Sequence, residues 1–339
     1  MKHTYLWLCG LLYAAMPAQA QVTYAVQPFS KDYHARIHID DTTAVFSSGW
    51  IEVYNNPGSK PIIKISSEEL ALSLHNGQAL ANIKELPYGE QSLVLYEDYN
   101  FDGINDLAIQ DGQNSCYHGP SFQVYLGTGK GFSHSPAFTR LAQEYCGMFT
   151  ADPVTRRINT MTKSGCCWHQ FSEFTVHNNE PRAEVIVEED MTRFPFGTIS
   201  TQTRNGNRMV TTTHTVLDTS GVKLLYTFTL EQSNKKVLLF TFDDDLLHYA
   251  LLRPDGHIEF TYPPLDAEAG PGRFGIRVVN GHTMLNFQNQ DVQYYISDAA
   301  HCSITVNIKD KSTVLAGQAA SAAGNLANLM KLTLQNLAW

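Results

Sequence analysis

Short runs of alternating apolar and polar residues, separated by turn-forming residues, cover most of this 339-residue chain. Residues 50–54 (WIEVY) form one such run, the turn sequence NNPG follows at 55–58, and a second run begins at 61. Alternation puts apolar side chains on one face of a strand, while Asn, Pro and Gly favour tight turns. The sequence therefore predicts a mainly β fold of antiparallel meanders, with a propeller-like or sandwich N-terminal domain.

The first twenty residues have the pattern of a secretory signal peptide. Lys2 is followed by an apolar run over 5–15, and the small-x-small sequence Ala18-Gln19-Ala20 ends the segment. The apolar run is shorter than the roughly 20 residues that cross a bilayer. We expect cleavage after Ala20, export to the periplasm, and no membrane span in the mature chain.

Two β-rich domains are predicted after the signal peptide. The stretch 201–208 (TQTRNGNR) is polar and contains Asn and Gly, which is typical of a linker or a long turn. We therefore expect a first domain over 21–200 that contains a metal loop, and a second β-rich domain over 201–339.

The C-terminal segment has a different pattern from the rest of the chain. Residues 314–337 are rich in alanine, and apolar or small residues recur at steps of three and four. These residues are Leu315, Ala319, Ala322, Leu326, Leu329, Thr333 and Leu337. The spacing predicts one amphipathic helix, packed on its own sheet or forming the seam of a homodimer.

The charge of the chain excludes one class of partner. It has 24 Lys and Arg against 33 Asp and Glu, a formal net charge of −9, and loss of Lys2 with the signal peptide makes this −10. An acidic surface repels phosphate backbones, so we expect no nucleic-acid binding; basic proteins are the better electrostatic partners.

Five cysteines remain after the signal peptide, in a compartment that oxidises thiols. Four of them lie within about fifty residues: Cys116, Cys146, Cys166 and Cys167. Because Cys166 and Cys167 are adjacent, we expect each to pair outward, with Cys116 and Cys146 in an order that the sequence leaves open. Cys302 is then the odd cysteine.

Residues 98–106 (DYNFDGIND) form a candidate calcium loop. Oxygen-bearing side chains stand at positions one, three, five and nine, and the carbonyl of the residue at position seven adds another donor. Calcium takes six to eight hard oxygen ligands, and Gly103 at position six permits the sharp turn. An EF-hand would need a Glu at position twelve, which is Ile109 here. The predicted ligands of a structural Ca²⁺ in this strand–loop–strand site are Asp98, Asn100, Asp102, Ile104 (carbonyl) and Asp106.

Catalytic motifs are absent from the sequence. It contains no GxSxG and no HExxH, and 127–131 (GTGKG) lacks the spacing of a phosphate-binding loop. His169 follows the cysteine pair, but those thiols are expected to be in disulfides. We therefore expect a protein that is not an enzyme.

The order of these motifs resembles the calcium-containing periplasmic immunity proteins of bacterial type IV and type VI secretion systems. The resemblance covers about residues 40–190. It is carried by the loop 98–106, Cys116, the strand 122–126, Gly131-Phe132, the segment 139–141, Gly165-Cys166-Cys167 and the aromatic strand 171–174. It implies a β-rich inhibitor that occludes the cleft of a lysozyme-like peptidoglycan hydrolase, and it carries over only the five calcium ligands.

Contact residues for such a hydrolase are a separate expectation. Aromatic and histidine side chains near the loop and the cysteines are the candidates, namely Tyr117, His118, Tyr145, Trp168 and His169. The alternative function is a secreted, calcium-dependent glycan-binding or adhesion module, suggested by the aromatic residues Tyr99 and Phe101 in the loop.

Overall fold

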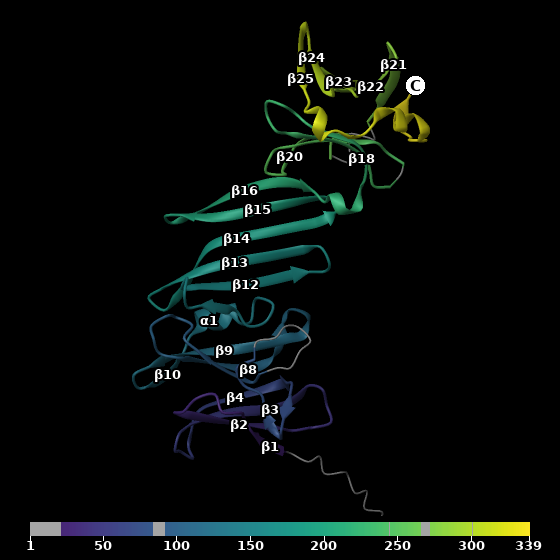
Figure 1. The fold of residues 1–339 in the computed structure, drawn as a ribbon. Helices are drawn as coiled ribbons and strands as arrows, with labels where there is room; N and C mark the ends of the chain where they lie inside the picture. Colours follow the sequence, from purple (N-terminus) through teal and green to yellow (C-terminus); the bar gives the residue numbers. More distant parts are fainter. Residues whose placement is uncertain (1–21, 84–91, 244, 266–271, 300) are drawn as a thin grey trace, which may run out of the picture. The chain divides into compact units, whose positions relative to one another are not determined.

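The computed structural model describes residues 22–83, 92–243, 245–265, 272–299 and 301–339, and it confirms a mainly β chain (Figure 1). The predicted signal peptide, 1–20, lies outside the described residues. The chain divides into two compact units. The first unit comprises Met1–Thr162 and Glu173–Ala183, and the second comprises Lys163–Ser172 and Glu184–Trp339.

The first unit begins with a four-stranded antiparallel sheet. Its order is β1 (Val22–Ala25), β2 (Tyr33–Ile39), β3 (Ser47–Asn55) and β4 (Pro61–Leu70). Alternate side chains of the middle strands are buried, as the sequence alternation predicts. A small ribbon, β5 (Leu74–His75) with β6 (Gln78–Ala79), follows it.

A second four-stranded sheet completes most of the first unit. Its order is β10 (Gly131–His134), β9 (Gly119–Thr128), β8 (Asp106–Ser115) and β7 (Val94–Glu97). The short helix α1 (Pro136–Leu141) begins where the Ser135 side chain accepts the Phe138 N–H, and proline at its start fits the first turn. Its buried Phe138 packs with Phe149 in the core beside β9.

The next sheet has six strands, and their order in the sheet is the same as their order in the sequence. They are β11 (Thr150–Asp152), β12 (Arg157–Ser164), β13 (Trp168–His177), β14 (Glu180–Arg193), β15 (Phe196–Asn205) and β16 (Arg208–Leu217). The stretch 201–208, predicted to be a linker or a long turn, contains the hairpin turn between β15 and β16, in which Gly206 takes a φ of 60°. The predicted domain boundary at 200 therefore falls inside a strand, because a Gly in a two-residue hairpin turn has the same sequence signature as a linker.

Two further sheets form the core of the second unit. One has the order β20 (Ile258–Tyr262), β19 (His248–Leu252), β18 (Lys236–Thr241), β17 (Lys223–Thr229) and β26 (Ala323–Gly324). The other has the order β25 (Lys311–Ala316), β24 (Ser303–Ile308), β23 (Val292–Ser297), β22 (His282–Asn289), β21 (Phe274–Val279) and β27 (Leu337–Ala338). Buried aromatic residues, among them Phe228, Tyr249 and Phe287, fill the shared core.

The predicted C-terminal amphipathic helix is wrong. The segment instead forms β25, a 3₁₀ turn at Ala319–Ser321, β26, a second 3₁₀ turn at Leu326–Lys331, and β27. Gly317 donates its N–H to the Cys302 carbonyl, and Gln318 donates to Thr229, so backbone groups that a helix would use internally pair with the sheets. Gly324, with φ of 79°, ends any continuous helical path. The predicted homodimer seam required this helix, which the segment does not form.

None of the helices in the described part of the chain has the length and hydrophobicity that a membrane crossing needs.

Truncation of a leucine in the second 3₁₀ turn tests this arrangement. Leu329 has 0% exposure and belongs to the core of the second unit, whereas Leu315 is only half-buried. We expect Leu329→Ala to lower the free energy of unfolding by about 2–5 kcal/mol and Leu315→Ala to cost clearly less. Urea denaturation of both variants measures the difference. Equal losses would contradict the structure and favour one continuous apolar helix face.

Candidate functional site

The predicted calcium loop connects β7 to β8, and hydrogen bonds tie its first five positions together. Asp98 accepts the N–H groups of Asp102 (3.1 Å) and Gly103 (2.8 Å). The same Asp102 N–H also lies 3.2 Å from Oδ1 of Asn100. Oxygens from positions one and three therefore share one hydrogen-bond donor. Asp102 at position five accepts the Ile104 N–H at 2.8 Å, which folds the loop back on itself.

Asp106, at position nine, is the buried end of this loop. Its carboxylate has 0% exposure and accepts N–H groups from Tyr99 (2.7 Å), Asn100 (3.3 Å) and Gly127 (2.7 Å). Burial raises the pKa of Asp106 to about 6, although these three hydrogen bonds act in the opposite direction. The charge of Asp98 adds to the rise. A nearby cation would favour the ionised form of this group.

The donor set of the loop fits calcium by its chemistry. Three carboxylates, one amide oxygen and one backbone carbonyl are all hard oxygen donors within nine residues. Within the described residues, no three His, Cys, Asp or Glu side chains are arranged to hold a metal ion, so the three carboxylates of the loop do not by themselves form a metal site. The calcium ion itself stays a prediction.

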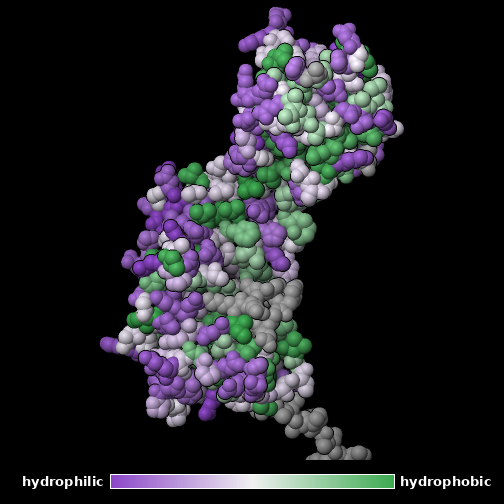
Figure 2. Space-filling model, viewed as in Figure 1, coloured by the Kyte–Doolittle hydropathy of each residue, from purple (hydrophilic) through white to green (hydrophobic). Residues whose placement is uncertain are grey.

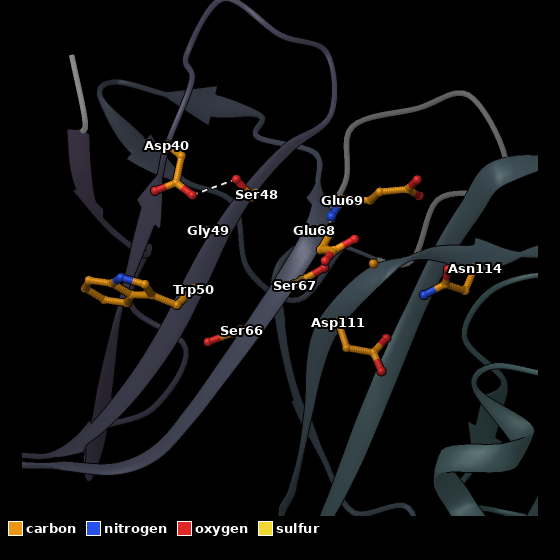
Figure 3. Close-up of a pocket in the computed structure, with 11 residues that line it drawn as sticks. Asp40, Ser48, Gly49, Trp50, Ser66, Ser67, Glu68, Glu69, Asp111 and Asn114 are labelled. Carbon is orange, nitrogen blue, oxygen red and sulfur yellow. Dashed lines mark hydrogen bonds between the residues drawn. The ribbon is translucent and has the colours of Figure 1, made fainter. Parts of the chain in front are cut away.

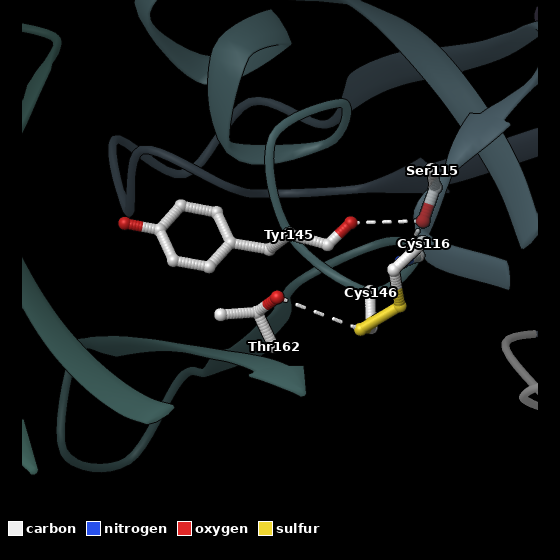
Figure 4. Close-up of a disulfide and its surroundings, with 6 residues drawn as sticks. Ser115, Cys116, Tyr145, Cys146 and Thr162 are labelled. Atoms are coloured by element: carbon white, nitrogen blue, oxygen red, sulfur yellow. Dashed lines mark hydrogen bonds between the residues drawn. A yellow bond between two sulfur atoms is a disulfide. The ribbon is translucent and has the colours of Figure 1, made fainter. Parts of the chain in front are cut away.

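The disulfides differ from the predicted pairing. Cys116 pairs with Cys146, with Cα atoms 4.8 Å apart, and Cys166 pairs with its neighbour Cys167, with Cα atoms 3.7 Å apart (Figure 4 shows the first pair). The outward pairing of the adjacent cysteines is therefore wrong. Gly165, in the turn between β12 and β13, has a φ of 63° and gives the hairpin the tight reversal in which the two cysteines lie. Cys302 is free and buried, as the odd count predicts.

Three of the predicted contact residues surround the Cys116–Cys146 disulfide in the first unit. Tyr117 and His118 are exposed and have φ values of 55° and 56°. Consecutive non-glycine residues in this region of φ/ψ space are costly, and such strain is concentrated at functional sites. Tyr145 is half-buried against Phe174, and its carbonyl accepts the Ser115 hydroxyl at 2.8 Å (Figure 4).

The remaining two predicted contacts belong to the second unit. Trp168 and His169 begin β13, directly after the Cys166–Cys167 disulfide, and both are half-buried. His169 stacks on the exposed ring of Phe171, with centroids 6.3 Å apart. The two residues therefore share a hairpin with the second disulfide.

An acidic groove of about 670 Å³, which no sequence motif predicts, lies in the first unit. Its walls come from β3, β4 and β8, and in Figure 3 Asp111 and Asn114 face the strand that carries Ser67, Glu68 and Glu69. Among its described lining residues, every ionisable side chain is a carboxylate: Asp40, Glu68, Glu69 and Asp111. The adjacent Glu68-Glu69 pair within a strand is the one signal that the sequence offers.

The carboxylates of the groove differ in exposure and in hydrogen bonding. Asp111 accepts Ser121 Oγ (2.8 Å) and Gln143 Nε2 (2.6 Å), so its position is fixed. Glu68 and Glu69 are exposed. Strand β8 has a bulge at Gly112, which lines the groove and has a φ of 152°. A Cβ at this position would lie 2.6 Å from the amide nitrogen of Asn114, so a larger residue would crowd that side chain.

The loop aromatics that suggested glycan binding are not both available. Tyr99 has 0% exposure and packs edge-on against Phe149 in the core. Phe101 is half-buried, and its carbonyl accepts Nη2 of Arg156 at 2.6 Å. Tyr99 therefore has no exposed face on which a sugar ring could stack.

No family model and no curated protein matches the sequence. Among solved structures, the chain is similar to a Xanthomonas type IV secretion system related protein, with 20% identity and a TM-score of 0.45 over 58% of this chain and 99% of that chain. Prolyl oligopeptidase B from Galerina marginata has 9% identity and a TM-score of 0.23, over 87% of this chain and 43% of that one. The Aleuria aurantia lectin has 9% identity and a TM-score of 0.20, over 89% and 96% of the chains.

Calcium removal tests the loop. We expect saturating Ca²⁺ to raise the melting temperature of the first unit by about 5–10 °C, since a ligand at 100 times its Kd adds about 2.7 kcal/mol. Asp102→Ala removes a ligand and should abolish this increment. The control is Asp41→Ala, which changes a carboxylate in the turn between β2 and β3 of the same unit and should keep it. An increment that survives in Asp102→Ala would contradict the predicted ligand set.

The two disulfides should contribute very differently to stability. The Cys116–Cys146 bond joins residues 30 apart, and its loss in Cys116→Ala/Cys146→Ala should cost about 3–4 kcal/mol by chain entropy. The Cys166–Cys167 bond closes no loop beyond one peptide, so Cys166→Ala/Cys167→Ala should cost far less. Thermal denaturation of the two double variants compares them. A larger loss for the adjacent pair would contradict this account.

Proposed function

We propose that this protein is a periplasmic immunity protein that binds and inhibits a peptidoglycan-degrading effector of a bacterial secretion system, and that it performs no turnover itself. The motif order shared with such immunity proteins motivates the proposal. The acidic groove of the first unit carries it, because the groove gives the chain a surface of defined charge and shape on which a basic enzyme can dock.

Charge complementarity supports this partner. A mature chain of net charge −10 attracts a basic, wall-binding enzyme over a distance, and the carboxylates in the groove then select cationic side chains on contact. Complementary charge mainly raises the association rate and the specificity. An inhibitor that must capture a toxin before it reaches the wall benefits from both.

The rigidity of the first unit also supports an inhibitory role. An inhibitor whose loop becomes ordered only on binding loses affinity, because the ordering costs conformational entropy. The turn with the exposed Tyr117 and His118 begins at a disulfide cysteine, so its conformation is held before any partner arrives. Tyr117 is 47% exposed and carries the kind of ring that is enriched at protein interfaces.

Export is part of the proposal. The leader pattern of residues 1–20 and the two disulfides suit an oxidising compartment, and peptidoglycan, the substrate of the effector, lies in the periplasm.

Charge reversal in the groove tests the docking surface. We expect Glu68→Lys/Glu69→Lys to weaken binding of the effector encoded beside this gene by at least about 10-fold, since like charges at an interface cost several kcal/mol. Its matched control is Asp291→Lys/Asp310→Lys, which changes the net charge equally at two turns of the second unit. Surface plasmon resonance at two salt concentrations separates the local effect from long-range attraction.

The proposal as a whole has a simpler test. Purified mature protein should form a complex with that effector and stop its lysis of peptidoglycan. Unchanged lysis with no complex would refute the immunity function. A glycan-array signal that chelation abolishes would favour the alternative adhesion module.

A further inference from the structure

We infer that Asn179 and Arg156, which lie far from the loop in sequence, position the predicted calcium loop and couple calcium binding to two neighbouring turns. The inference rests on the proposed calcium site and adds residues that the loop motif does not contain. Both residues belong to the first unit and reach the loop from outside it: Asn179 from the turn between β13 and β14, and Arg156 from the turn between β11 and β12.

Asn179 holds a predicted ligand, Asn100, in the orientation that Asp102 sets. Nδ2 of Asn100 donates to Oδ1 of Asn179 (3.0 Å) and to Oδ2 of Asp102 (2.9 Å). A carboxylate oxygen only accepts hydrogen bonds, so the Asn100 amide must present its nitrogen to Asp102. Its other N–H is then directed to Asn179, and Oδ1 of Asn100 is left as the oxygen available to the ion. Asn100 is 5% exposed, so few competing waters reach this amide.

Arg156 fixes the backbone between two predicted ligands. Its Nη2 donates to the Phe101 carbonyl at 2.6 Å, and its guanidinium carbon lies 5.9 Å from the centre of the Phe101 ring. Phe101 has a φ of 62°, a conformation that a bulky residue adopts only when other contacts hold it there. This conformation reverses the chain between Asn100 and Asp102. The contact with Arg156 therefore stabilises the bend that brings the side chains at positions three and five together.

These contacts imply reciprocal coupling. Residues that hold ligands in place raise metal affinity, and by linkage the bound metal must stabilise the contacts that those residues make. Calcium should therefore slow hydrogen exchange in the turns at 152–157 and 177–180 as well as in the loop itself. A loop that bound calcium independently would protect only residues 98–106.

The turn between β13 and β14 supplies a matched pair of variants. Asn178 and Asn179 are both exposed and have φ values of 51° and 61°, so replacement by Ala carries a similar backbone cost at each. Only Asn179 contacts Asn100. We expect Asn179→Ala to weaken Ca²⁺ binding on the order of 10-fold and Asn178→Ala to leave it nearly unchanged. Asn179→Asp keeps the acceptor and should retain wild-type affinity or exceed it.

Isothermal titration of the mature protein with CaCl₂ measures these affinities, and hydrogen exchange measures the turns. Circular dichroism first confirms that each variant is folded without calcium. Equal affinities for Asn179→Ala and Asn178→Ala, with calcium protection confined to 98–106, would overturn the inference while leaving the calcium site and the immunity function intact. A wild-type protein that takes up no calcium would overturn both the site and the inference, whatever the result of the effector-binding test.

Discussion

The buried carboxylate of Asp106 is the interaction on which the first unit depends. A carboxylate with 0% exposure is costly to bury, and three backbone N–H groups from both sides of β8 offset part of that cost. Two of the donors belong to the loop, and the third, Gly127, belongs to β9. The group thereby fixes the loop against the sheet. Its raised pKa shows that the compensation is incomplete, which is why a cation bound beside it would stabilise the fold.

The parts of this protein that the sequence predicts well are those with local causes. Strand alternation depends on neighbouring residues, and it identified the mainly β class and the approximate position of most strands. The loop 98–106 carries its predicted donors within nine residues, so the motif can be recognised from the sequence, whereas the contacts that Asn179 and Arg156 make with it cannot.

The wrong predictions share a different cause. Leu326 and Leu329 have helical spacing. The N–H groups of Gly317 and Gln318, which precede them, donate to the carbonyls of Cys302 and Thr229, and the sequence does not reveal these distant partners. The pairing of Cys116 with Cys146 brings together segments 30 residues apart, and the Gly206 turn was compatible with a linker or a long turn because local sequence does not say whether the flanking strands pair. The acidic groove was missed for the same reason: its walls come from residues 40–50, 66–69 and 111–114.

Strand β8 connects the features that the proposed function uses. It starts at Asp106 in the predicted calcium loop, passes Asp111 and Asn114 in the wall of the groove, and ends next to Cys116 in a disulfide. An ion at one end and a covalent bond at the other would restrict the same strand from both sides. A groove wall held in this way loses little conformational entropy when a partner binds, so more of the electrostatic attraction contributes to affinity. On this argument, the predicted calcium loop would act in the proposed recognition by stiffening the surface that makes contact and would not itself touch the partner.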